Sequence, residues 1–544
     1  MVKSYLDIGS SNNHVKADII IVGCSLPGIV TAHKLKKKFG DSMDIVVLDL
    51  AGTRKGSSKC NVAFQDDSEE ETKEFIYEGT AKEIIDNVAR YYLAMYSKEF
   101  NIPLPDALVS PNFVETRLNK LVECSNGNVV ACAKNFCDFD YLNFLERFEL
   151  NQYQTLLDQN MKNLFHANKF DDESERRTLL YYDHTTMEEH LCEALIFNAS
   201  RDIMRITIRL VCGTTADAVS VLFYLHQCYR TSSTRNHIDG DNTRLREKLL
   251  GFCRKRLTSK LQKSVASITY PAKTIKEIRT HSDEEVILKI SKIKGEMSYT
   301  CNLLAMALRP DELKNIKMGS ELVSDCEIQM ASSMKQGKAR KFVIQYEEKF
   351  WREYGYSGDI LSLRGPIIWA TERPKMSTTG SQEKYAALVG YLKVTDGSEN
   401  SKDAVIAQLI RLFGDEAASV VSYKETDIED VFVPRCGDYV AIRTLTNKLS
   451  SRFLEWGALD IFADGDVAAA LEAGHTAYLH LLRCLRPQAQ TYEDVSIAEW
   501  PTLFTENVVT KWLAGFNLRT SVRVTFYTTV FFLGLRMVHS FMRK

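Results

Sequence analysis

Residues 17–49, ADIIIVGCSLPGIVTAHKLKKKFGDSMDIVVLD, decide the fold of the first part of the chain. Residues 17–23 are a continuous apolar run rich in β-branched side chains, which is typical of a strand buried on both faces. A turn follows at residues 24–28, a helical pattern covers residues 29–39, and a second apolar run covers residues 44–49. Strand, turn, helix and strand in this order form a βαβ unit, which predicts a parallel sheet.

The turn between the first strand and the helix lies where a dinucleotide fingerprint, GxGxxG, would lie. Gly23 and Gly28 occupy its first and last positions, and Ser25 occupies the middle one. The glycines allow a tight turn and close packing of helix on strand, and the positive helix N-terminus favours a pyrophosphate. Asp49 ends the second strand, where a carboxylate would accept hydrogen bonds from ribose hydroxyls. These residues predict nucleotide binding, with a βαβ unit that holds no ligand as the alternative.

The segment after Asp49 carries a second signal. Arg54 and Gly56 follow this acid in an order that resembles the ExxxRxGGR element of proteins that bind FAD, although Ser57 replaces the second glycine. By itself the segment would be a loop. Together with the preceding turn it predicts that Arg54 and Gly56 contact a cofactor.

Length and composition limit the remaining choices. The 544 residues are too many for one hydrophobic core, so two domains or one split domain are expected. The 69 Lys and Arg nearly balance the 71 Asp and Glu, which argues against nucleic acid as a partner. The 13 Cys are scattered without metal-ligand spacing, so no metal site is predicted and reduced thiols are expected. The polar leader MVKSYLDIGSSNNHVK lacks the pattern of a signal peptide, which favours a cytoplasmic location.

Three later stretches resemble the flavin-containing amine oxidases, monoamine oxidases especially. Residues 341–358, KFVIQYEEKFWREYGYSG, are similar to a strand and the "FW" segment of that family. Residues 468–477, AAALEAGHTA, are similar to its closing helix, which in the family points its N-terminus at the flavin. Residues 88–105, VARYYLAMYSKEFNIPLP, resemble an earlier helix. The resemblance runs in register from Asp18 to about Leu482.

The resemblance implies the fold class α/β, with a discontinuous Rossmann-type FAD-binding domain plus a mixed α+β substrate domain. The boundaries that follow are residues 1–85, 235–325 and 428–485 for the FAD-binding domain, 86–234 and 326–427 for the substrate domain, and 486–544 for a C-terminal tail.

The resemblance also implies an activity. Enzymes of this family oxidise an amine to an imine, which water hydrolyses to an aldehyde, with oxygen as acceptor and hydrogen peroxide as by-product. The register gives Lys341 the role of a lysine that holds a water against the flavin; a solvated strand lysine is the alternative. Tyr439 matches a tyrosine that forms one wall of an aromatic substrate cage. Asp466 stands where the opposite wall would be.

Asp438 stands where monoamine oxidases carry the cysteine that is linked to FAD, and Cys436 is displaced from that position by two residues. A carboxylate cannot form the thioether, so the expected cofactor is non-covalent FAD. Asp438 and Asp466 would suit a second ammonium, which favours a small or polycationic amine as substrate. A catalytically inactive protein that keeps the fold as a binding or interaction module is the alternative.

Residues 524–535, VTFYTTVFFLGL, form an uncharged, aromatic-rich run between Arg523 and Arg536. A spanning helix needs about 20 apolar residues, and this run is shorter. A cytoplasmic protein that is soluble or contacts a membrane peripherally is therefore expected. The resemblance implies, as the alternative, a tail anchor in the mitochondrial outer membrane. A homodimer is a further expectation.

Overall fold

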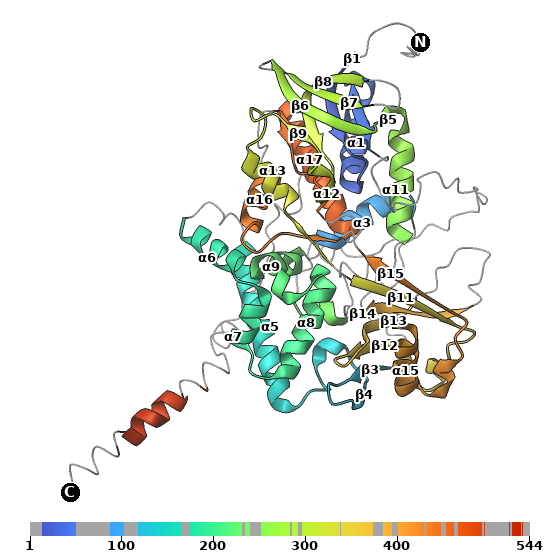
Figure 1. The fold of residues 1–544 in the computed structure, drawn as a ribbon, viewed down its shortest axis with the longest axis vertical. Helices are drawn as coiled ribbons and strands as arrows, with labels where there is room; N and C mark the ends of the chain where they lie inside the picture. Colours follow the sequence, from blue (N-terminus) through green and yellow to red (C-terminus); the bar gives the residue numbers. More distant parts are fainter. Residues whose placement is uncertain are drawn as a thin grey trace.

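The computed structural model describes residues 14–50, 88–102, 118–165, 173–230, 234–239, 252–282, 285–291, 296–337, 339–373, 385–393, 401–428, 431–447, 453–461, 466–491, 494, 522, 525–534 and 536. The segment with Arg54 and Gly56 lies outside these residues. The described elements form two large sheets, one at each end of the body, and a small sheet of two strands, with helices around and between the large sheets (Figure 1).

The first sheet confirms the predicted βαβ unit. In it, β1 (His14–Val22) pairs in parallel with β2 (Ile45–Asp49) on one side and β8 (Glu296–Met306) on the other. The strand order is β5-β2-β1-β8-β7-β6-β9, and β17 pairs with β8. The outer strands are β5 (Thr269–Pro271), β6 (Thr274–Ser282), β7 (Glu285–Ser291), β9 (Lys317–Met318) and β17 (Leu454–Glu455).

Helices cover one face of this sheet. Ile19 and Ile21 of β1 pack on that face, whereas Ile20 and Val22 pack into the core on the other face, which explains the continuous apolar run. The covering helices are α1 (Leu26–Phe39), α3 (Val88–Glu99), α11 (Phe252–Val265) and α17 (Val467–Leu485). The domain boundary predicted at residue 85 would place α3 in the second domain, whereas α3 packs on α17 beside the first sheet.

The second sheet has the strand order β15-β11-β14-β13-β12-β3-β4. Its strands are β3 (Asn119–Glu123), β4 (Val129–Cys132), β11 (Ala339–Tyr346), β12 (Tyr356–Ser362), β13 (Ile367–Glu372), β14 (Ala386–Leu392) and β15 (Ser422–Ile428). One face packs on α14 (Phe350–Glu353) and α15 (Ser401–Phe413). Residues of the other face, among them Trp369 and Tyr391, join the core of the helical layer.

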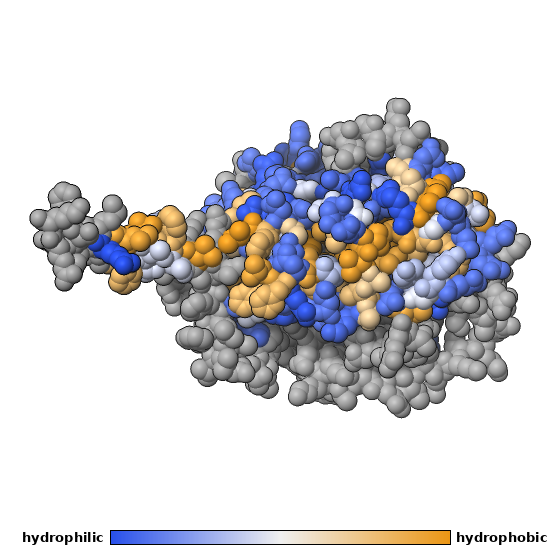
Figure 2. Space-filling view, turned by 90° about the horizontal axis from the view of Figure 1, so that it is seen from below, coloured by the Kyte–Doolittle hydropathy of each residue, from blue (hydrophilic) through white to orange (hydrophobic). Residues whose placement is uncertain are grey.

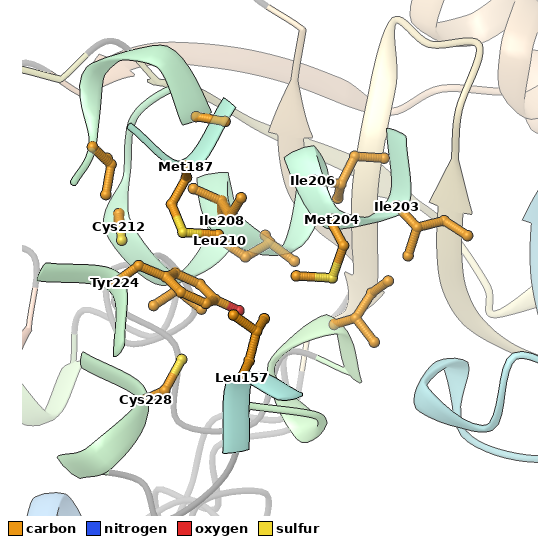
Figure 3. Close-up of a cluster of buried hydrophobic side chains, with 14 of the residues drawn as sticks. Leu157, Met187, Ile203, Met204, Ile206, Ile208, Leu210, Cys212, Tyr224 and Cys228 are labelled. Carbon is orange, nitrogen blue, oxygen red and sulfur yellow. The ribbon is translucent and has the colours of Figure 1, made fainter. Parts of the chain in front are cut away.

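A layer of helices lies beside this sheet. Its helices are α5 (Phe144–Phe165), α6 (Glu173–His184), α7 (Met187–Ala194), α8 (Asn198–Cys212) and α9 (Val221–Arg230). Figure 3 shows their apolar core, in which Leu157 of α5 and Tyr224 of α9 lie among side chains of α8. The buried Glu149 of α5 accepts hydrogen bonds from the N–H groups of Ile196 and Phe197, at the start of α8.

The remaining short elements are β10 (Lys335–Gln336), β16 (Phe432–Val433), α12 (Pro310–Leu313), α13 (Asp325–Ser332) and α16 (Tyr439–Asn447).

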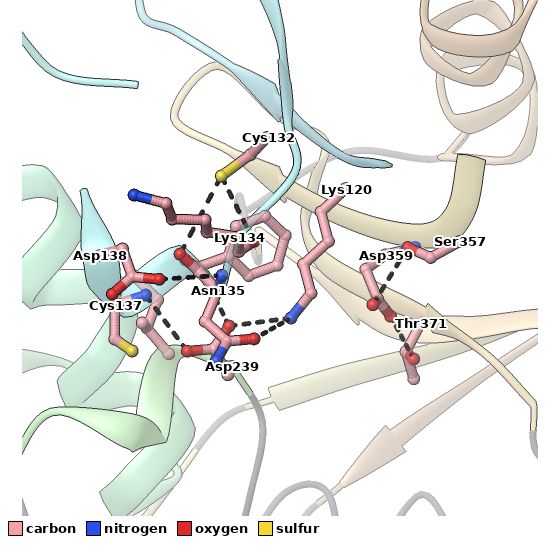
Figure 4. A network of polar contacts seen from close by, with 12 residues as sticks. Lys120, Cys132, Lys134, Asn135, Cys137, Asp138, Asp239, Ser357, Asp359 and Thr371 are labelled. Atoms are coloured by element: carbon pink, nitrogen blue, oxygen red, sulfur yellow. Dashed lines mark hydrogen bonds and ion pairs between the residues drawn. The ribbon is translucent and has the colours of Figure 1, made fainter. Parts of the chain in front are cut away.

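Asp239 holds the segment after α9 in place. Its carboxylate accepts from the N–H groups of Phe136 and Cys137 and pairs with Lys120 at 3.0 Å (Figure 4).

Residues 525–534 are helical and stand away from the body (Figure 1). Their apolar side chains are exposed, Tyr527 by 68% and Phe532 by 67%, and Figure 2 shows this apolar surface leading away from the molecule. Within the described part of the chain, no helix has both the length and the apolar character needed to cross a membrane.

Candidate functional site

Gly23 and Gly28, the two glycines of the fingerprint, lie close to the backbone and side chain of Ala307. Gly23 follows β1 with φ +106°, and its N–H donates to the carbonyl of Leu48 at 2.9 Å. A Cβ on Gly23 would lie 2.2 Å from the carbonyl oxygen of Ala307, and a Cβ on Gly28 would lie 2.4 Å from the Cβ of Ala307. Side chains at either position would push α1 away from the sheet. The glycines therefore have a packing role, whatever binds beside them.

Helix α1 begins at Leu26, three residues before the predicted start, because Ser25 caps it. The Oγ atom of Ser25 accepts from the N–H of Gly28 at 3.5 Å, and only 4% of Ser25 is exposed. Pro27 is tolerated in the first turn and contributes no N–H group. The start of α1 thus offers fewer open N–H donors to a phosphate than a glycine at position 25 and a non-proline residue at 27 would.

The strand-turn-helix could still hold a dinucleotide. Asp49 ends β2 half-buried, beside the turn after β1, as the fingerprint predicts. The backbone carbonyl of Asp49 accepts from the N–H of Ala272 at 2.7 Å, so its backbone is fixed. The carboxylate is suited to ribose hydroxyls and the start of α1 to a pyrophosphate. The residues present therefore fit a dinucleotide cofactor, although the Ser25 cap takes up one N–H donor.

Lys341 lies on β11, half-buried, opposite Tyr391 of β14 and Thr426 of β15. Its neighbour Phe342 packs with Ile344 into the core around α15. Because side chains alternate along a strand, Lys341 lies on the opposite face of the sheet, the face of Tyr391. Lys341 therefore lies on the sheet face that joins the helical layer, and not on the face that packs on α15.

Tyr439 is the first residue of α16, and only 3% of it is exposed. Its hydroxyl lies 2.5 Å from Nδ1 of His226 in α9, and the guanidinium of Arg443 donates to Nε2 of the same ring. Burial and the positive charges of Arg443 and Arg230 hold the pKa of His226 well below its usual value. His226 is therefore neutral near pH 7.

The start of α16 is fixed by helix α6. The buried carboxylate of Asp183 accepts from the N–H of Val440 at 2.9 Å, and burial raises its pKa. The backbone carbonyl of Asp183 accepts from the N–H of Gly437 at 2.7 Å and from the thiol of Cys436 at 3.1 Å. Burial raises the pKa of Cys436, so this residue remains a thiol. Asp438 is half-buried and accepts a long hydrogen bond, 3.4 Å, from the hydroxyl of Ser333.

Asp466 is the N-cap of α17. One carboxylate oxygen accepts from the N–H of Ala469 at 2.9 Å, and the other is 2.7 Å from Nη1 of Arg230. The Nε of Arg230 is 2.9 Å from a carboxylate oxygen of Glu472. Both oxygens of Asp466 are thus engaged by the protein itself, so a direct contact with a substrate ammonium would have to compete with these bonds.

The structure brings two predicted site residues, Tyr439 and Asp466, into one cluster. Tyr439 and Arg443 contact His226, and Asp466 pairs with Arg230, which lies one turn further along α9. Sequence patterns did not single out His226, Arg230 or Arg443. An arginine at the end of an amphipathic helix resembles any favourable C-terminal charge, so only burial reveals its role. Gly23, Ser25, Gly28 and Asp49 form a second group, around the ends of β1 and β2.

No known protein-family profile matches the sequence. A probable flavin-containing monoamine oxidase A from Dictyostelium discoideum is 22% identical over 246 residues, which are 44% of this chain and 52% of that protein. The chain thus matches about half the length of this curated relative.

Solved structures match over more of the chain. Wild-type putrescine oxidase bound to putrescine has a TM-score of 0.63 at 14% identity, covering 86% of this chain and 99% of its own. Cyclohexylamine oxidase from Brevibacterium oxydans IH-35A has a TM-score of 0.57 at 15% identity, covering 86% and 100%. At these identities the likeness establishes the fold. The resemblance seen in the sequence is confirmed: this chain has the fold of the flavin-containing amine oxidases.

Proposed function

We propose that the chain is an FAD-dependent amine oxidase-like oxidoreductase. It would oxidise a small or polycationic amine to an imine, which water hydrolyses to an aldehyde, with oxygen as acceptor and hydrogen peroxide as by-product. The observation that carries this proposal is the fold shared with putrescine oxidase and cyclohexylamine oxidase over 86% of the chain. Fold alone does not determine activity, so the residues of the two clusters must support it.

The cofactor would lie along the turn after β1, with Asp49 at the ribose and the start of α1 at the pyrophosphate. When bound, FAD supplies the acceptor for the electrons of the amine. Non-covalent binding is supported by Asp438 at the linkage position and by the thiol of Cys436, which donates to the carbonyl of Asp183. The capping of α1 by Ser25 predicts that this FAD is held less tightly than with a full set of N–H donors.

The substrate would bind near Tyr439 and Lys341. The ring of Tyr439 would offer an apolar wall, and its hydroxyl is hydrogen-bonded to His226. Lys341 would hold a water through its ammonium group. Asp438 would attract a second ammonium, since its hydrogen bond to Ser333 is long. Asp466 would act through Arg230, because both of its oxygens are already bound.

A catalytically inactive protein that keeps the fold as a binding or interaction module is the second candidate. Two observations favour it: Ser25 caps the helix that would face a pyrophosphate, and the Asp466–Arg230 pair stands where the family has an aromatic wall. In both places a group of the protein itself makes the contact that an active enzyme would make with its cofactor or substrate.

The membrane contact, the location and the oligomeric state are separate proposals. The exposed apolar helix of residues 525–534 supports peripheral membrane contact. If the intact chain resists carbonate extraction from cell membranes and a version ending at Leu518 does not, the tail is an anchor, which favours the mitochondrial outer membrane over a cytoplasmic location. A homodimer remains a prediction.

The activity is tested by incubating the purified chain, supplied with FAD, with putrescine and with benzylamine while hydrogen peroxide is followed. The enzyme proposal predicts peroxide formation that depends on the amine, and faster turnover of the diamine. If peroxide does not form with either amine while FAD is bound, the inactive module is the better account.

A further inference from the structure

Arg230 joins two helices that belong to different layers of the molecule. It ends α9, beside the second sheet, and its side chain is 5% exposed. Its guanidinium pairs with Asp466 at 2.7 Å and with Glu472 at 2.9 Å, two carboxylates at the N-cap and in the first two turns of α17. Helix α17 packs on α1 beside the first sheet. One buried cation therefore ties the end of α9 to the start of α17, between the two sheets (Figure 1).

The charges at this junction suit the two helix ends that meet there. The C-terminal end of a helix is partly negative and favours a cation, whereas the N-terminal end is partly positive and favours carboxylates. Arg230 and Asp466 meet both preferences at once. The planar guanidinium reaches its two partners through different nitrogens, Nη1 and Nε, which fixes its orientation. A lysine ammonium would supply the charge without this geometry.

The same charge acts on the neighbouring tyrosine. Arg230 and Arg443 both disfavour protonation of His226, whose ring is hydrogen-bonded to Tyr439. His226 lies one turn before Arg230 on α9, so a movement of Arg230 relative to α17 would move His226 and Tyr439 with it. Arg230 thus fixes the start of α17 relative to His226 and the ring of Tyr439.

The segment after Arg230 is anchored separately. The hydroxyl of Thr234 donates to Asp158 of α5 at 2.6 Å, and Asp239 is held at the N–H groups of Phe136 and Cys137. These contacts are all made within the helical layer and the second sheet, whereas Arg230 reaches across to α17. Among the described residues, Arg230 is therefore one contact through which the helical layer holds the start of α17.

We propose that Arg230 is a positioning residue: its forked ion pair with Asp466 and Glu472 locks the start of α17 to α9 and thereby sets where Tyr439 lies relative to α17. The link that Arg230 makes between α9 and α17 rests on its two ion pairs alone. Its consequence for substrate binding rests on the proposed function, in which Tyr439 forms a wall for the amine.

Two variants test the lock. Arg230→Lys keeps the positive charge but loses the planar guanidinium, whose Nε and Nη1 bind the two carboxylates. Because removing only the arginine would leave two buried carboxylates unpaired, the second variant is R230M/D466N/E472Q, in which the amide introduced by D466N can still cap α17 through its oxygen. Arg411→Met is the matched control, since Arg411 pairs at 2.9 Å with the buried Glu123 inside the second sheet and its helix α15.

Amide hydrogen exchange of the full chain is the readout. Both Arg230 variants should exchange at least tenfold faster in the first turns of α17 and at the start of α16, with α15 unchanged, and Arg411→Met should leave α17 and α16 as in the wild type. For the active enzyme, the KM for the amine should rise more than kcat falls. Unchanged exchange at α17 in both variants, or an equal increase in both sheets, would overturn the lock. If exchange changes as expected while the wild type shows no amine oxidation, the lock stands and the proposed function fails.

Discussion

The hydroxyl oxygen of Tyr439 lies 2.5 Å from Nδ1 of His226, whose other ring nitrogen accepts from Arg443. An arginine can only donate, so Nε2 of the neutral imidazole is the acceptor and Nδ1 carries the proton. His226 therefore donates to Tyr439, and the O–H of Tyr439 is left to donate elsewhere. Burial also raises the pKa of Tyr439, so the phenol stays protonated near pH 7.

Tyr439→Phe tests what this hydrogen bond contributes. The ring would stay in place, because it packs edge-on against Phe223 with 5.0 Å between ring centroids. Losing one buried hydrogen bond costs about 1 kcal/mol, so we expect KM to rise roughly fivefold and kcat to change little. Steady-state kinetics with a diamine measures both. Tyr224→Phe, the same atomic change at a buried position of α9, should leave KM as in the wild type. Equal effects of the two variants would contradict the role of Tyr439.

His475 predicts how stability depends on pH. It lies in α17 between the rings of Tyr92 and Tyr478, at centroid distances of 5.3 and 5.8 Å. Burial, assisted by the charge of Lys34, lowers its pKa to about 4. The unfolded chain takes up this proton near pH 6.5 and the folded chain only near pH 4. The stabilisation is therefore complete above about pH 6.5 and decreases as the pH falls toward 4, by about 3 kcal/mol.

Urea unfolding between pH 7 and pH 4 measures this effect. In His475→Phe, which keeps an aromatic ring, the free energy of unfolding should depend less on pH by about the same 3 kcal/mol. An identical pH dependence of the variant and the wild type would show that His475 does not contribute.

Ser25→Gly should strengthen FAD binding. The substitution removes the hydroxyl that accepts from Gly28 and so opens one N–H group to the pyrophosphate. We expect the dissociation constant to fall about fivefold, because one such contact contributes roughly 1 kcal/mol. Quenching of FAD fluorescence on titration measures it. Ser324→Gly is the control, since Ser324 caps α13 in the same way; weaker or unchanged binding by Ser25→Gly would show that this helix start does not contact the cofactor.

Lys341→Met should slow amine oxidation or flavin reoxidation by about 10- to 100-fold while FAD remains bound, which is typical for the loss of one positioned polar group. Stopped-flow spectra separate the two half-reactions. Lys424→Met supplies the control, because Lys424 is an exposed lysine on β15, in the same sheet. Turnover of Lys341→Met at the wild-type rate would show that another residue has this role.

Local patterns predicted the βαβ unit of the first sheet, because β1, α1 and β2 are each specified by neighbouring residues. The boundary of α1 was missed by three residues, since Ser25 was considered as a cofactor residue rather than as an N-cap. The cluster around Tyr439 could not be predicted in the same way. Its bonds join residues 213 and 236 positions apart, and no local periodicity reports such a pairing.

The ion pair at Asp466 illustrates the same limit. In the sequence alone, Asp466 is a carboxylate without an evident partner, and its negative charge would suit a substrate ammonium. In the structure the charge is neutralised by Arg230, whose side chain approaches from another layer of the molecule. Residue type therefore predicts what a group is able to bind, whereas the fold determines what it has already bound.

The absorbance spectrum of the purified chain, before and after acid precipitation, tests the central claim most directly. The account predicts a visible flavin band in the native protein, alone or after addition of FAD, and its complete transfer to the supernatant on precipitation, because Asp438 cannot form a thioether and the thiol of Cys436 is directed at the carbonyl of Asp183. Flavin that stays in the pellet would contradict non-covalent binding. A colourless protein that takes up no added FAD would contradict the oxidase itself.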